Sequence, residues 1–579
     1  MLGTCMSQRT CAVVISGLVF AVVGLTLIVR PLTAYGIVVV LIGAGAGIAG
    51  VLLVASYWRR PWAWFAALAL VAAAGMIVTH VAFVAEWLPY ALAVVLGINA
   101  IRLFRLMIRP RRSGKERAAD GVFVIANAIG AYLFWLWPDA ATVVVSVAVS
   151  ASFIVLGLAF VVSALFRRKK PPFSSTGWRY AIAAFCAVIS VLSLMGSVQL
   201  RTGIARVDSF YSWSGTIPET PGTVVRTETY DGVVPDGAKA VKILYSTTYS
   251  DGSPALASAV VTYPTSTSDG KRTVLAWEHG TTGVAQSCGP SVGSEALTEE
   301  AIPGISRAIE RGWVIVATDY PGQGTSGKYP YLVGQGEGRA TLDAIRAATH
   351  IQEAHASEHA WIWGHSQGGH AALWAGQIAA DYAPDIDVLG VAALSAARDP
   401  LSLAASVVDA QSSALSKVVI ALVLVPYAEE YSDVHLNDVV NPAGIGIVKA
   451  FASRCVTEKP TTVSAGVALA LGLDKPLYSI DISDGAIRDR LAQNIASGDV
   501  PAPIFLGQGV EDEVIPISMQ RSFASELCAA GKTVSVHEYA GFSHLGVVAP
   551  DSPLIDDLYQ WADAVAQGEQ PSTCQEAAE

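Results

Sequence analysis

The chain has 579 residues, 15% of them charged, and its formal net charge is −10 at pH 7. This average hides two opposite parts. The first 200 residues hold 16 of the 38 Lys and Arg residues but only 4 of the 48 acids, so they carry about +12 and the remainder carries about −22. Nucleic-acid binding needs a basic surface, so the acidic remainder excludes nucleic acid as an expected partner.

The basic N-terminal third consists of apolar segments, each long enough for a helix to cross about 30 Å of hydrocarbon. The first segment could instead be a signal peptide, but no clear small-residue cleavage site follows it, and six further segments do. We therefore expect a transmembrane domain over residues 1–201, which makes the protein an integral membrane protein. The predicted spans lie near residues 11–29, 32–56, 61–79, 81–101, 121–137, 140–166 and 180–200.

The Lys and Arg residues of the short loops predict the orientation of these spans, because cytoplasmic loops are enriched in them. They follow the second, fourth and sixth spans, at Arg59–Arg60, between Arg102 and Arg117, and at Arg167–Lys170. The alternate loops hold Arg30 alone or no base. The N-terminus is therefore expected in the cytoplasm. The chain should leave the membrane near Leu200 on the outer side, which makes the C-terminal domain extracytoplasmic.

The spans also carry a weak internal repeat. Arg30–Thr33, before an apolar run that ends in two arginines, is echoed about 107 residues later by Trp137–Ala140 before a similar run. Leu88–Tyr90 starts a weaker middle copy. Three hairpins of this kind resemble the HdeD-like acid-resistance membrane proteins over roughly residues 10–168.

After a polar connector at residues 202–222, short β-rich runs alternate with amphipathic helical segments near Ile302–Arg311, Gly338–Glu353 and Ser518–Ala530. Such alternation predicts an α/β domain over residues 223–579, with a mostly parallel sheet and helices on both faces. The first two strands should form a hairpin-like lead-in. The eight predicted strands are Ala240–Thr247, Ala257–Tyr263, Thr273–Glu278, Trp313–Thr318, Ala360–Gly364, Val388–Leu394, Pro503–Gly507 and Thr533–Tyr539.

The sequence Trp361-Ile-Trp-Gly364-His365-Ser366-Gln-Gly368 is an apolar strand that runs into a G-x-S-x-G motif, and a helical segment, Ala371–Ala380, follows it. The two glycines permit the sharp strand-to-helix turn that exposes a nucleophilic serine above the sheet of an α/β-hydrolase. The three parts occur in the required order, which favours Ser366 as a nucleophile over an ordinary turn serine.

A serine nucleophile needs a base and an acid that orients the base, and in this fold both follow the serine on loops after late strands. His544 follows the last predicted strand and is the expected base. Asp512 follows Pro503–Gly507 and lies 32 residues before His544, so it is the expected acid. Glu511 and Glu513 are the alternatives, although the D-x-x-I-P pattern favours Asp512.

An oxyanion hole requires two backbone N–H donors. One should come from Gln367, next to the nucleophile. The other should come from the loop Glu278–Gly283, where Thr281 is the expected donor and His279 is expected to shape the loop. The remaining histidines are attributed to packing or solvation. Since none of them shows a metal-ligand spacing, neither a metal nor a cofactor is expected.

Residues 398–499 form an insertion before the acid-bearing strand. It contains apolar stretches at Leu401–Leu424, Ile445–Phe451 and Val467–Leu473. Leu415–Val425 is too short and too interrupted to cross a membrane. It is either a buried cap helix or a lid that lines an acyl pocket, and the sequence leaves both interpretations open.

Several motifs of the C-terminal part occur together in one order. From about Glu219 to Cys574 the chain resembles the secretory lipase family (lipase A-type). The resemblance implies an α/β-hydrolase that cleaves carboxylic or triacylglycerol esters with the triad above, and a cap between the sixth and seventh strands. The N-terminal helices depart from it, since such enzymes are usually soluble and secreted. The motifs are Glu278–Gly283, Asp319–Gly324, Tyr331–Gly334 with Gly338–Ala340, and Gly364–Gly368.

Four cysteines lie in the outer domain, and an even number suits an oxidising compartment. We expect a Cys288–Cys455 disulfide, which would tie the oxyanion loop to the cap, and a Cys528–Cys574 disulfide, which would tie a helix to the tail. Four cysteines allow three pairings, so the other pairings stay open.

Three functional hypotheses follow. The first is a membrane-anchored serine hydrolase that cleaves lipid or other apolar esters through an acyl-enzyme on Ser366. The second is an acyltransferase that uses the same triad on lipid or cell-envelope alcohols. The third is a stress-related membrane protein whose outer domain only binds a ligand.

Overall fold

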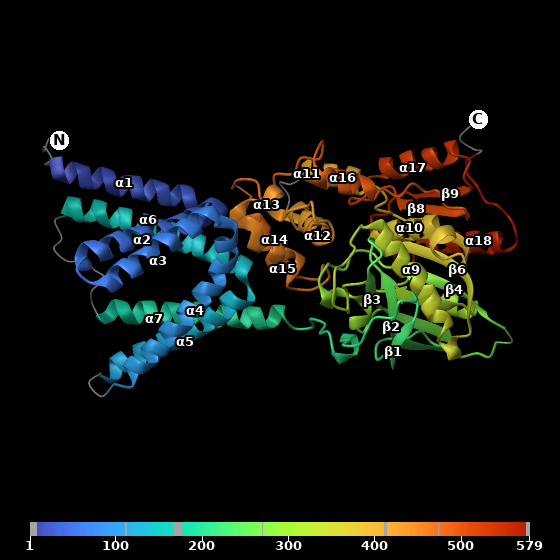
Figure 1. Cartoon of the computed structure of the whole chain (residues 1–579), viewed down its shortest axis with the longest axis horizontal. Helices are drawn as coiled ribbons and strands as arrows, with labels where there is room; N and C mark the ends of the chain where they lie inside the picture. The colour runs from blue at the N-terminus through green and yellow to red at the C-terminus, as the bar shows by residue number, and fades with distance from the viewer. Residues whose placement is uncertain are drawn as a thin grey trace.

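The structure is a computed structural model that describes residues 8–109, 113–166, 176–268, 270–409, 414–472 and 474–574. A helical N-terminal region lies at one end of the elongated molecule, the α/β domain at the other, and a group of cap helices between them (Figure 1). Two basic clusters that support the predicted membrane orientation, Arg111–Arg112 and Arg167–Lys170, lie outside the described residues.

The described residues of the N-terminal region form seven helices that are long and apolar enough to cross a membrane, and each coincides with a predicted span. Three of them, α2, α4 and α6, have 27, 27 and 29 residues, while the other four have 19 to 25. Helix α5 begins seven residues before its predicted span, because Ser113 and Glu116 form a capping box outside the apolar stretch. The helices are α1 (Gln8–Ile28), α2 (Pro31–Tyr57), α3 (Pro61–Thr79), α4 (Val81–Met107), α5 (Gly114–Leu136), α6 (Pro138–Phe166) and α7 (Thr176–Leu200).

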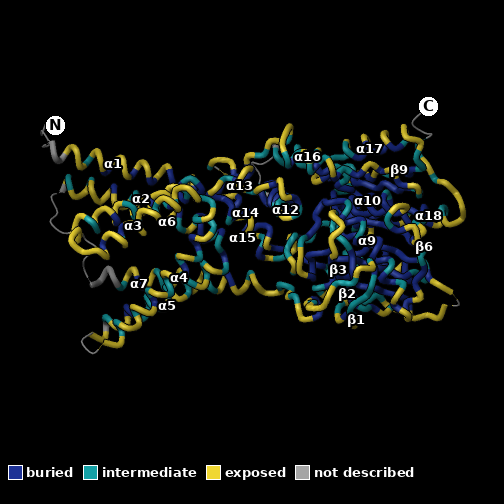
Figure 2. Tube along the Cα trace, viewed as in Figure 1, coloured by how far each residue is buried: buried dark blue, intermediate teal, exposed yellow. Residues whose placement is uncertain are grey.

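Apolar side chains cover the outside of these helices, which are mostly exposed in Figure 2. Among the described residues, all but five of the exposed large hydrophobic side chains lie before Arg201. An apolar surface of this extent requires a covering, and a lipid bilayer supplies one. Helices α1 and α6 pack through glycines: a Cβ on Gly17 would lie 2.7 Å from the carbonyl oxygen of Gly157.

The α/β domain contains a nine-stranded sheet in the order β1-β2-β3-β5-β4-β6-β7-β8-β9. Strands β1 to β3 and the β3–β5 pair are antiparallel, and the remaining pairs are parallel. All eight predicted strands are present, and β2 and β3 form the expected lead-in hairpin. The strands are β1 (Val224–Thr229), β2 (Ala238–Thr248), β3 (Pro254–Pro264), β4 (Arg272–Glu278), β5 (Val314–Thr318), β6 (Ala356–His365), β7 (Asp387–Leu394), β8 (Ile504–Gly509) and β9 (Val534–Tyr539).

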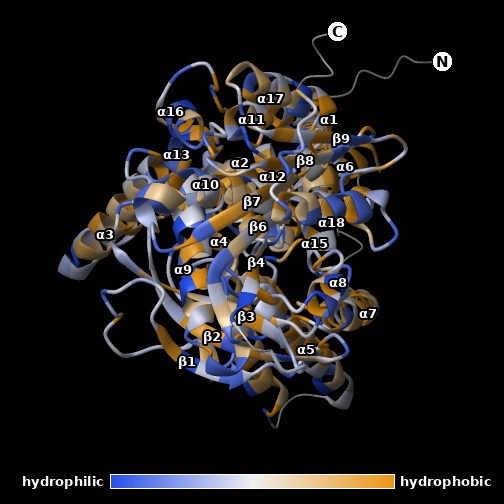
Figure 3. Cartoon of the chain, turned by 90° about the vertical axis from the view of Figure 1, so that its right-hand side faces the viewer, coloured by the Kyte–Doolittle hydropathy of each residue, from blue (hydrophilic) through white to orange (hydrophobic). Residues whose placement is uncertain are grey.

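Helices cover both faces of this sheet, as a mostly parallel sheet requires. Buried residues of α9 (Gly334–Thr349), α10 (Gln367–Tyr382) and α17 (Ile517–Ala529) share one core with the sheet. Helices α8 (Ile305–Glu310) and α18 (Pro553–Ala566) share a second core with it. Strand β7 is coloured as hydrophobic in Figure 3, and its last five residues are buried.

The described residues of the cap form six helices between β7 and β8. The predicted cap helix Leu415–Val425 lies within α12, and the apolar stretch Leu401–Leu424 also includes most of α11, while residues 410–413 lie outside the described residues. Short 3-10 turns also occur, both in the cap and elsewhere in the C-terminal part. They are Ser209–Tyr211, Gln286–Cys288, Pro290–Val292, Gln352–Ala354, Pro442–Gly444 and Gly546–Val548. The cap helices are α11 (Pro400–Asp409), α12 (Ala414–Glu430), α13 (Leu436–Val439), α14 (Ile445–Ala452), α15 (Thr461–Ala470) and α16 (Ala486–Gln493).

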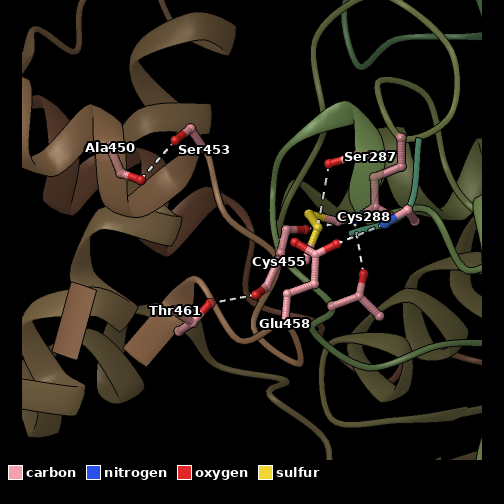
Figure 4. Close-up of a disulfide and its surroundings, with 11 residues drawn as sticks. Ser287, Cys288, Ala450, Ser453, Cys455, Glu458 and Thr461 are labelled. Atoms are coloured by element: carbon pink, nitrogen blue, oxygen red, sulfur yellow. Dashed lines mark hydrogen bonds between the residues drawn. A yellow bond between two sulfur atoms is a disulfide. The ribbon is translucent and has the colours of Figure 1, made fainter. Parts of the chain in front are cut away.

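Both predicted disulfides are present. Cys288 and Cys455 join the loop region after β4 to the cap, with a Cα–Cα distance of 5.2 Å (Figure 4). Cys528 in α17 is bonded to Cys574 in the C-terminal tail. Two of the six described cysteines, Cys11 and Cys186, are free, and both lie in the apolar helices.

Candidate active site

Ser366 stands at a sharp turn between β6 and α10. Its backbone has φ 58° and ψ −116°, a conformation that L-residues adopt at a cost of about 1–3 kcal/mol. The turn depends on small neighbours, because a Cβ on Gly364 would overlap the carbonyl oxygen of Gly368, and one on Gly368 would overlap that of Glu278. The glycines that the motif supplies are therefore sterically required at this turn.

The structure brings Ser366, His544 and Asp512 together in one line of hydrogen bonds. His544 Nε2 lies 3.0 Å from Ser366 Oγ, and His544 Nδ1 lies 3.0 and 2.9 Å from the two carboxylate oxygens of Asp512. All three residues are buried. The two alternative acids contact backbone amides instead: Glu511 accepts from Gly541 N–H, and Glu513 accepts from the N–H of His544 itself.

The surroundings of Asp512 favour its ionised form. Burial raises its pKa, but hydrogen bonds from His544 and from the backbone N–H groups of Ile515 and Val514 outweigh burial, so the pKa lies below its usual value. A carboxylate at this place accepts the Nδ1–H of His544. The Nε2 lone pair of His544 then faces Ser366 Oγ and can take its proton.

The two expected oxyanion donors border the same point. Gln367 is the first residue of α10, where N–H groups have no intrahelical partner and the helix dipole favours negative charge. The loop after β4 passes beside the nucleophile, since a Cβ on Gly280 would lie 3.5 Å from Ser366 Cβ. The next residue, Thr281, is held by a hydrogen bond of 2.8 Å between its hydroxyl and that of Tyr331.

The side chain of Gln367 belongs to a buried network that the sequence did not reveal. Its amide lies 2.8 Å from the hydroxyl of Tyr329 and 2.9 Å from Glu337 Oε1. The other oxygen of Glu337 lies 2.6 Å from His370 Nδ1, and His370 Nε2 lies 2.7 Å from the carbonyl oxygen of Asn494. Its one signal in the sequence was that Glu337 and His370 lie next to two of the motifs shared with secretory lipases, Gly338–Ala340 and Gly364–Gly368.

Two further histidines shape the site without entering the line of hydrogen bonds. His365 Nε2 lies 2.9 Å from the carbonyl oxygen of His544, and burial, with the neighbouring His544, lowers the pKa of His365 to about 3. Burial also lowers the pKa of His279 to about 4, and its Nδ1 lies 2.7 Å from the carbonyl oxygen of Gly280. Both rings therefore stay neutral and brace the loops that hold His544 and Thr281.

An apolar pocket in the cap lies next to Tyr331. Helices α11, α12 and α16 supply most of its walls, together with Leu332 and Ile480. Tyr331 lines this pocket and also bonds Thr281, so the pocket borders the loop of the expected oxyanion donor. Within the described part of the chain, no group of three or more His, Cys, Asp or Glu residues is placed to hold a metal ion.

Comparison with known proteins assigns the C-terminal region to a family. Residues 293–570 match the secretory lipase family model, a range that includes Ser366, Asp512 and His544. The C-terminal region belongs to the secretory lipase family. As a secretory lipase region with lipase and esterase relatives, it is a carboxylic ester hydrolase.

Two curated relatives of this secretory lipase region illustrate its range. A probable inactive lipase of Mycobacterium tuberculosis is 26% identical over 356 residues, which are 58% of this chain and 76% of that protein. A trichothecene C-3 esterase of Fusarium sporotrichioides is also 26% identical, over 56% of this chain and 76% of that protein. The X-ray structure of Candida antarctica lipase A covers 63% of this chain and 87% of its own, with 19% identity and a TM-score of 0.52, which identifies the α/β-hydrolase fold.

Proposed function

We propose that the chain is a membrane-anchored serine hydrolase that cleaves lipid-type carboxylic esters through an acyl-enzyme on Ser366. The observation that carries the proposal is the continuous line of hydrogen bonds from Asp512 through His544 to Ser366 at a strained turn. The same arrangement argues against a domain that only binds a ligand, because binding alone needs neither the strain nor the oriented base.

The reaction then proceeds in two halves. His544 Nε2 accepts the hydroxyl proton as Ser366 Oγ bonds to the ester carbonyl carbon, and the oxyanion receives hydrogen bonds from the N–H groups of Gln367 and Thr281. Collapse of this intermediate breaks the bond to the alcohol oxygen, which leaves with the proton from His544. Water then attacks the acyl-enzyme, again with His544 as base, and releases the carboxylic acid.

The cap pocket supports an apolar acyl group as the substrate. Its walls are almost entirely aliphatic, and it borders the loop that carries Thr281. An acyl chain of a lipid ester would remove that surface from water, which is favourable by about 25 cal/mol per Å². Helix α12 is then both a buried cap helix and a wall of the acyl site.

We further propose that residues 1–201 anchor the enzyme in the cell membrane as an HdeD-like domain, with the N-terminus in the cytoplasm and residues 223–579 outside. The seven apolar helices support the anchor, and the basic loops support the orientation. The two disulfides of the α/β domain and cap fit an oxidising compartment. The test is a fusion of the C-terminus to a reporter enzyme that works only in the cytoplasm. Activity of this reporter would contradict the proposed orientation.

A fluorophosphonate probe tests the nucleophile directly, because it forms a covalent bond only with an activated serine. The full-length protein should be labelled, Ser366→Ala should not, and Ser406→Ala, an exposed serine of α11, should be labelled like the original protein. Equal labelling of Ser366→Ala would refute the proposal.

Acyl transfer to an alcohol is the second candidate, because the aliphatic pocket beside Tyr331 suits the chain of a lipid alcohol as well as an acyl chain. Supplying an ester with increasing concentrations of a lipid alcohol distinguishes the two reactions. A hydrolase releases mainly free acid, whereas a transferase forms mainly the new ester.

A further inference from the structure

The cap packs against the ends of α2, α4 and α6 that point toward the α/β domain (Figure 1). Apolar residues of the three cap-facing helix ends and of the cap share one cluster, which includes Leu32 of α2, Ala85 of α4 and Val448 of α14. The active-site residue Tyr331 belongs to the same cluster. The helical region and the hydrolase are therefore joined by a continuous packed interface and not only by the connector after α7.

A buried ion pair lies at the centre of this interface. Arg454, after α14, donates to both carboxylate oxygens of Asp139, in the first turn of α6, at 2.7 Å each. Asp139 is fully buried, and the side chain of Arg454 is 8% exposed. The guanidinium also bonds Ser464 at 2.6 Å and lies 5.0 Å from the ring centre of Trp137. A carboxylate, a hydroxyl and an aromatic ring thus surround the guanidinium group of Arg454.

Two polar contacts flank the pair on the neighbouring helices. Thr33 in the first turn of α2 donates to the carboxylate of Asp474 from its backbone N–H, at 3.0 Å, and from its hydroxyl. Lys449 of α14 pairs with Glu86 of α4 at 2.8 Å. Each of the three helices therefore has its own polar contact with the cap, which fixes the cap in position and in rotation.

The residue after Arg454 connects this interface to the active site. Cys455 forms the disulfide with Cys288 (Figure 4). The N–H of Val456 donates to the carbonyl oxygen of Thr282 at 2.7 Å. Gly283 packs tightly here, since a Cβ on it would lie 2.9 Å from Cys455 Cα. Arg454–Val456 is thus bonded to Asp139 on one side and to the loop of the expected oxyanion donor Thr281 on the other.

We propose that the helical region is a positioning element of the hydrolase, and not only its anchor. The Arg454–Asp139 pair fixes the segment 454–456, and this segment fixes the loop 281–283 and with it the N–H of Thr281. Arg454 and Asp139 act through Thr281 and touch no substrate, so they are positioning residues. This inference rests on the proposed function, because it assigns the oxyanion donor to the same loop.

Cross-linking tests the interface without any activity. A Thr33→Cys/Asp474→Cys variant of the full-length protein, in lipid nanodiscs, should form an intramolecular disulfide on mild oxidation, detected by peptide mapping. A Thr33→Cys/Asp551→Cys variant is the matched control and should not cross-link, since exposed Asp551 directly precedes α18, which packs on strands β7, β8 and β9. Absence of the 33–474 cross-link would overturn the interface.

Kinetics with a short, water-soluble ester test the coupling, because such a substrate needs no membrane access. Arg454→Gln should lower kcat about tenfold or more with little change in KM, since displacing a transition-state donor by about 1 Å can cost 10²-fold. The kcat of Arg454→Lys, which keeps the charge, should lie between those of Arg454→Gln and the original protein. Arg490→Gln, which breaks the exposed cap pair with Asp433, should match the original protein.

Restoring the interface should restore activity. In an Arg454→Gln background, oxidised Thr33→Cys/Asp474→Cys protein should regain kcat, while the same protein with these cysteines alkylated first should not. A normal kcat in Arg454→Gln, or a cross-link that forms without raising kcat, would overturn the coupling. If instead no variant and no original protein turned over ester, the proposed function would fail, while the cross-link would still decide the interface.

Discussion

The carboxylate of Glu337 accepts a hydrogen bond from the side-chain amide of Gln367 at 2.9 Å, one residue after the nucleophile. The same carboxylate lies 2.6 Å from Nδ1 of His370, whose Nε2 lies 2.7 Å from the carbonyl oxygen of Asn494. The side chain of Gln367 is thereby held from within the domain.

Removing the Glu337 side chain should destabilise the α/β domain strongly. In Glu337→Ala the N–H of Leu332, the amide of Gln367 and the ring of His370 each lose a buried acceptor, at about 1–3 kcal/mol per group. Thermal unfolding should shift down by roughly 5–10 °C. Glu353→Ala, which changes an exposed glutamate in the 3-10 turn after α9, is the control, and its unfolding midpoint should not shift. An unchanged midpoint in Glu337→Ala would contradict the network.

Asp512→Asn should abolish most turnover, whereas the corresponding amide substitution at Glu513 should be tolerated. An asparagine cannot stabilise the imidazolium of His544 as a carboxylate does, so kcat should fall by about 10³–10⁴-fold. Glu513→Gln keeps an oxygen that can accept from His544 N–H, and its kcat should stay within about threefold. Ester-hydrolysis kinetics of both variants give the comparison, and a severe loss in Glu513→Gln alone would move the acid to that residue.

Glu278 should make the protein less stable as the pH rises. Burial raises its pKa to about 8, whereas an unfolded glutamate titrates near 4.3. Between these values only the folded state keeps the proton, so stability falls with increasing pH by up to about 1.4 kcal/mol per unit. Burial raises the pKa of Asp319 and of Asp343 only to about 6. The loss of stability expected between pH 6.5 and 8 is therefore attributed to Glu278.

The matching measurement is denaturation of the original protein and of Glu278→Gln across this window. The glutamine variant should lose the slope and gain stability relative to the original protein as the pH approaches 8. Glu353→Gln, at an exposed site, should keep the original slope. Parallel curves for the original protein and Glu278→Gln would show that Glu278 is ionised when folded.

Filling the cap pocket should change the preferred acyl chain. Val423 lines the pocket, and a tryptophan there would occupy space that a long acyl chain needs. Val423→Trp should lower kcat/KM for a palmitate ester about tenfold relative to a butyrate ester, which corresponds to about 1.4 kcal/mol. Ser406→Trp, on the exposed side of α11, should leave the ratio unchanged. An equal loss for both esters would place the acyl chain elsewhere.

Most of the fold could be predicted because its elements are long, regular and strongly patterned. Seven apolar runs and eight buried strands are visible as local composition, whereas β1 is an edge strand with three exposed residues at one end, and its polar Arg226-Thr-Glu-Thr229 hides the pattern.

The line of hydrogen bonds could be predicted because this fold orders its serine, acid and base along the chain. The Glu337 network could not, since its members come from two helices and a cap residue whose partnership depends on packing alone. The Arg454–Asp139 pair was equally hidden: 315 positions separate the two residues, and each reads as an isolated charge in its own segment. Sequence pattern reveals chemistry that is local or ordered, but not the partner of a single buried charge.

In the proposed membrane arrangement, the lengths of α2, α4 and α6 determine how far the hydrolase stands above the lipid. At 1.5 Å per residue these helices are about 40 Å long, roughly 10 Å more than the hydrocarbon core. Their cap-facing turns carry Thr33, Glu86 and Asp139, which suits a part of each helix that projects from the bilayer. A thicker membrane would draw these polar turns toward hydrocarbon or tilt the helices. Activity should therefore depend on bilayer thickness. It should be highest in bilayers thin enough to leave the three cap-facing helix ends in water.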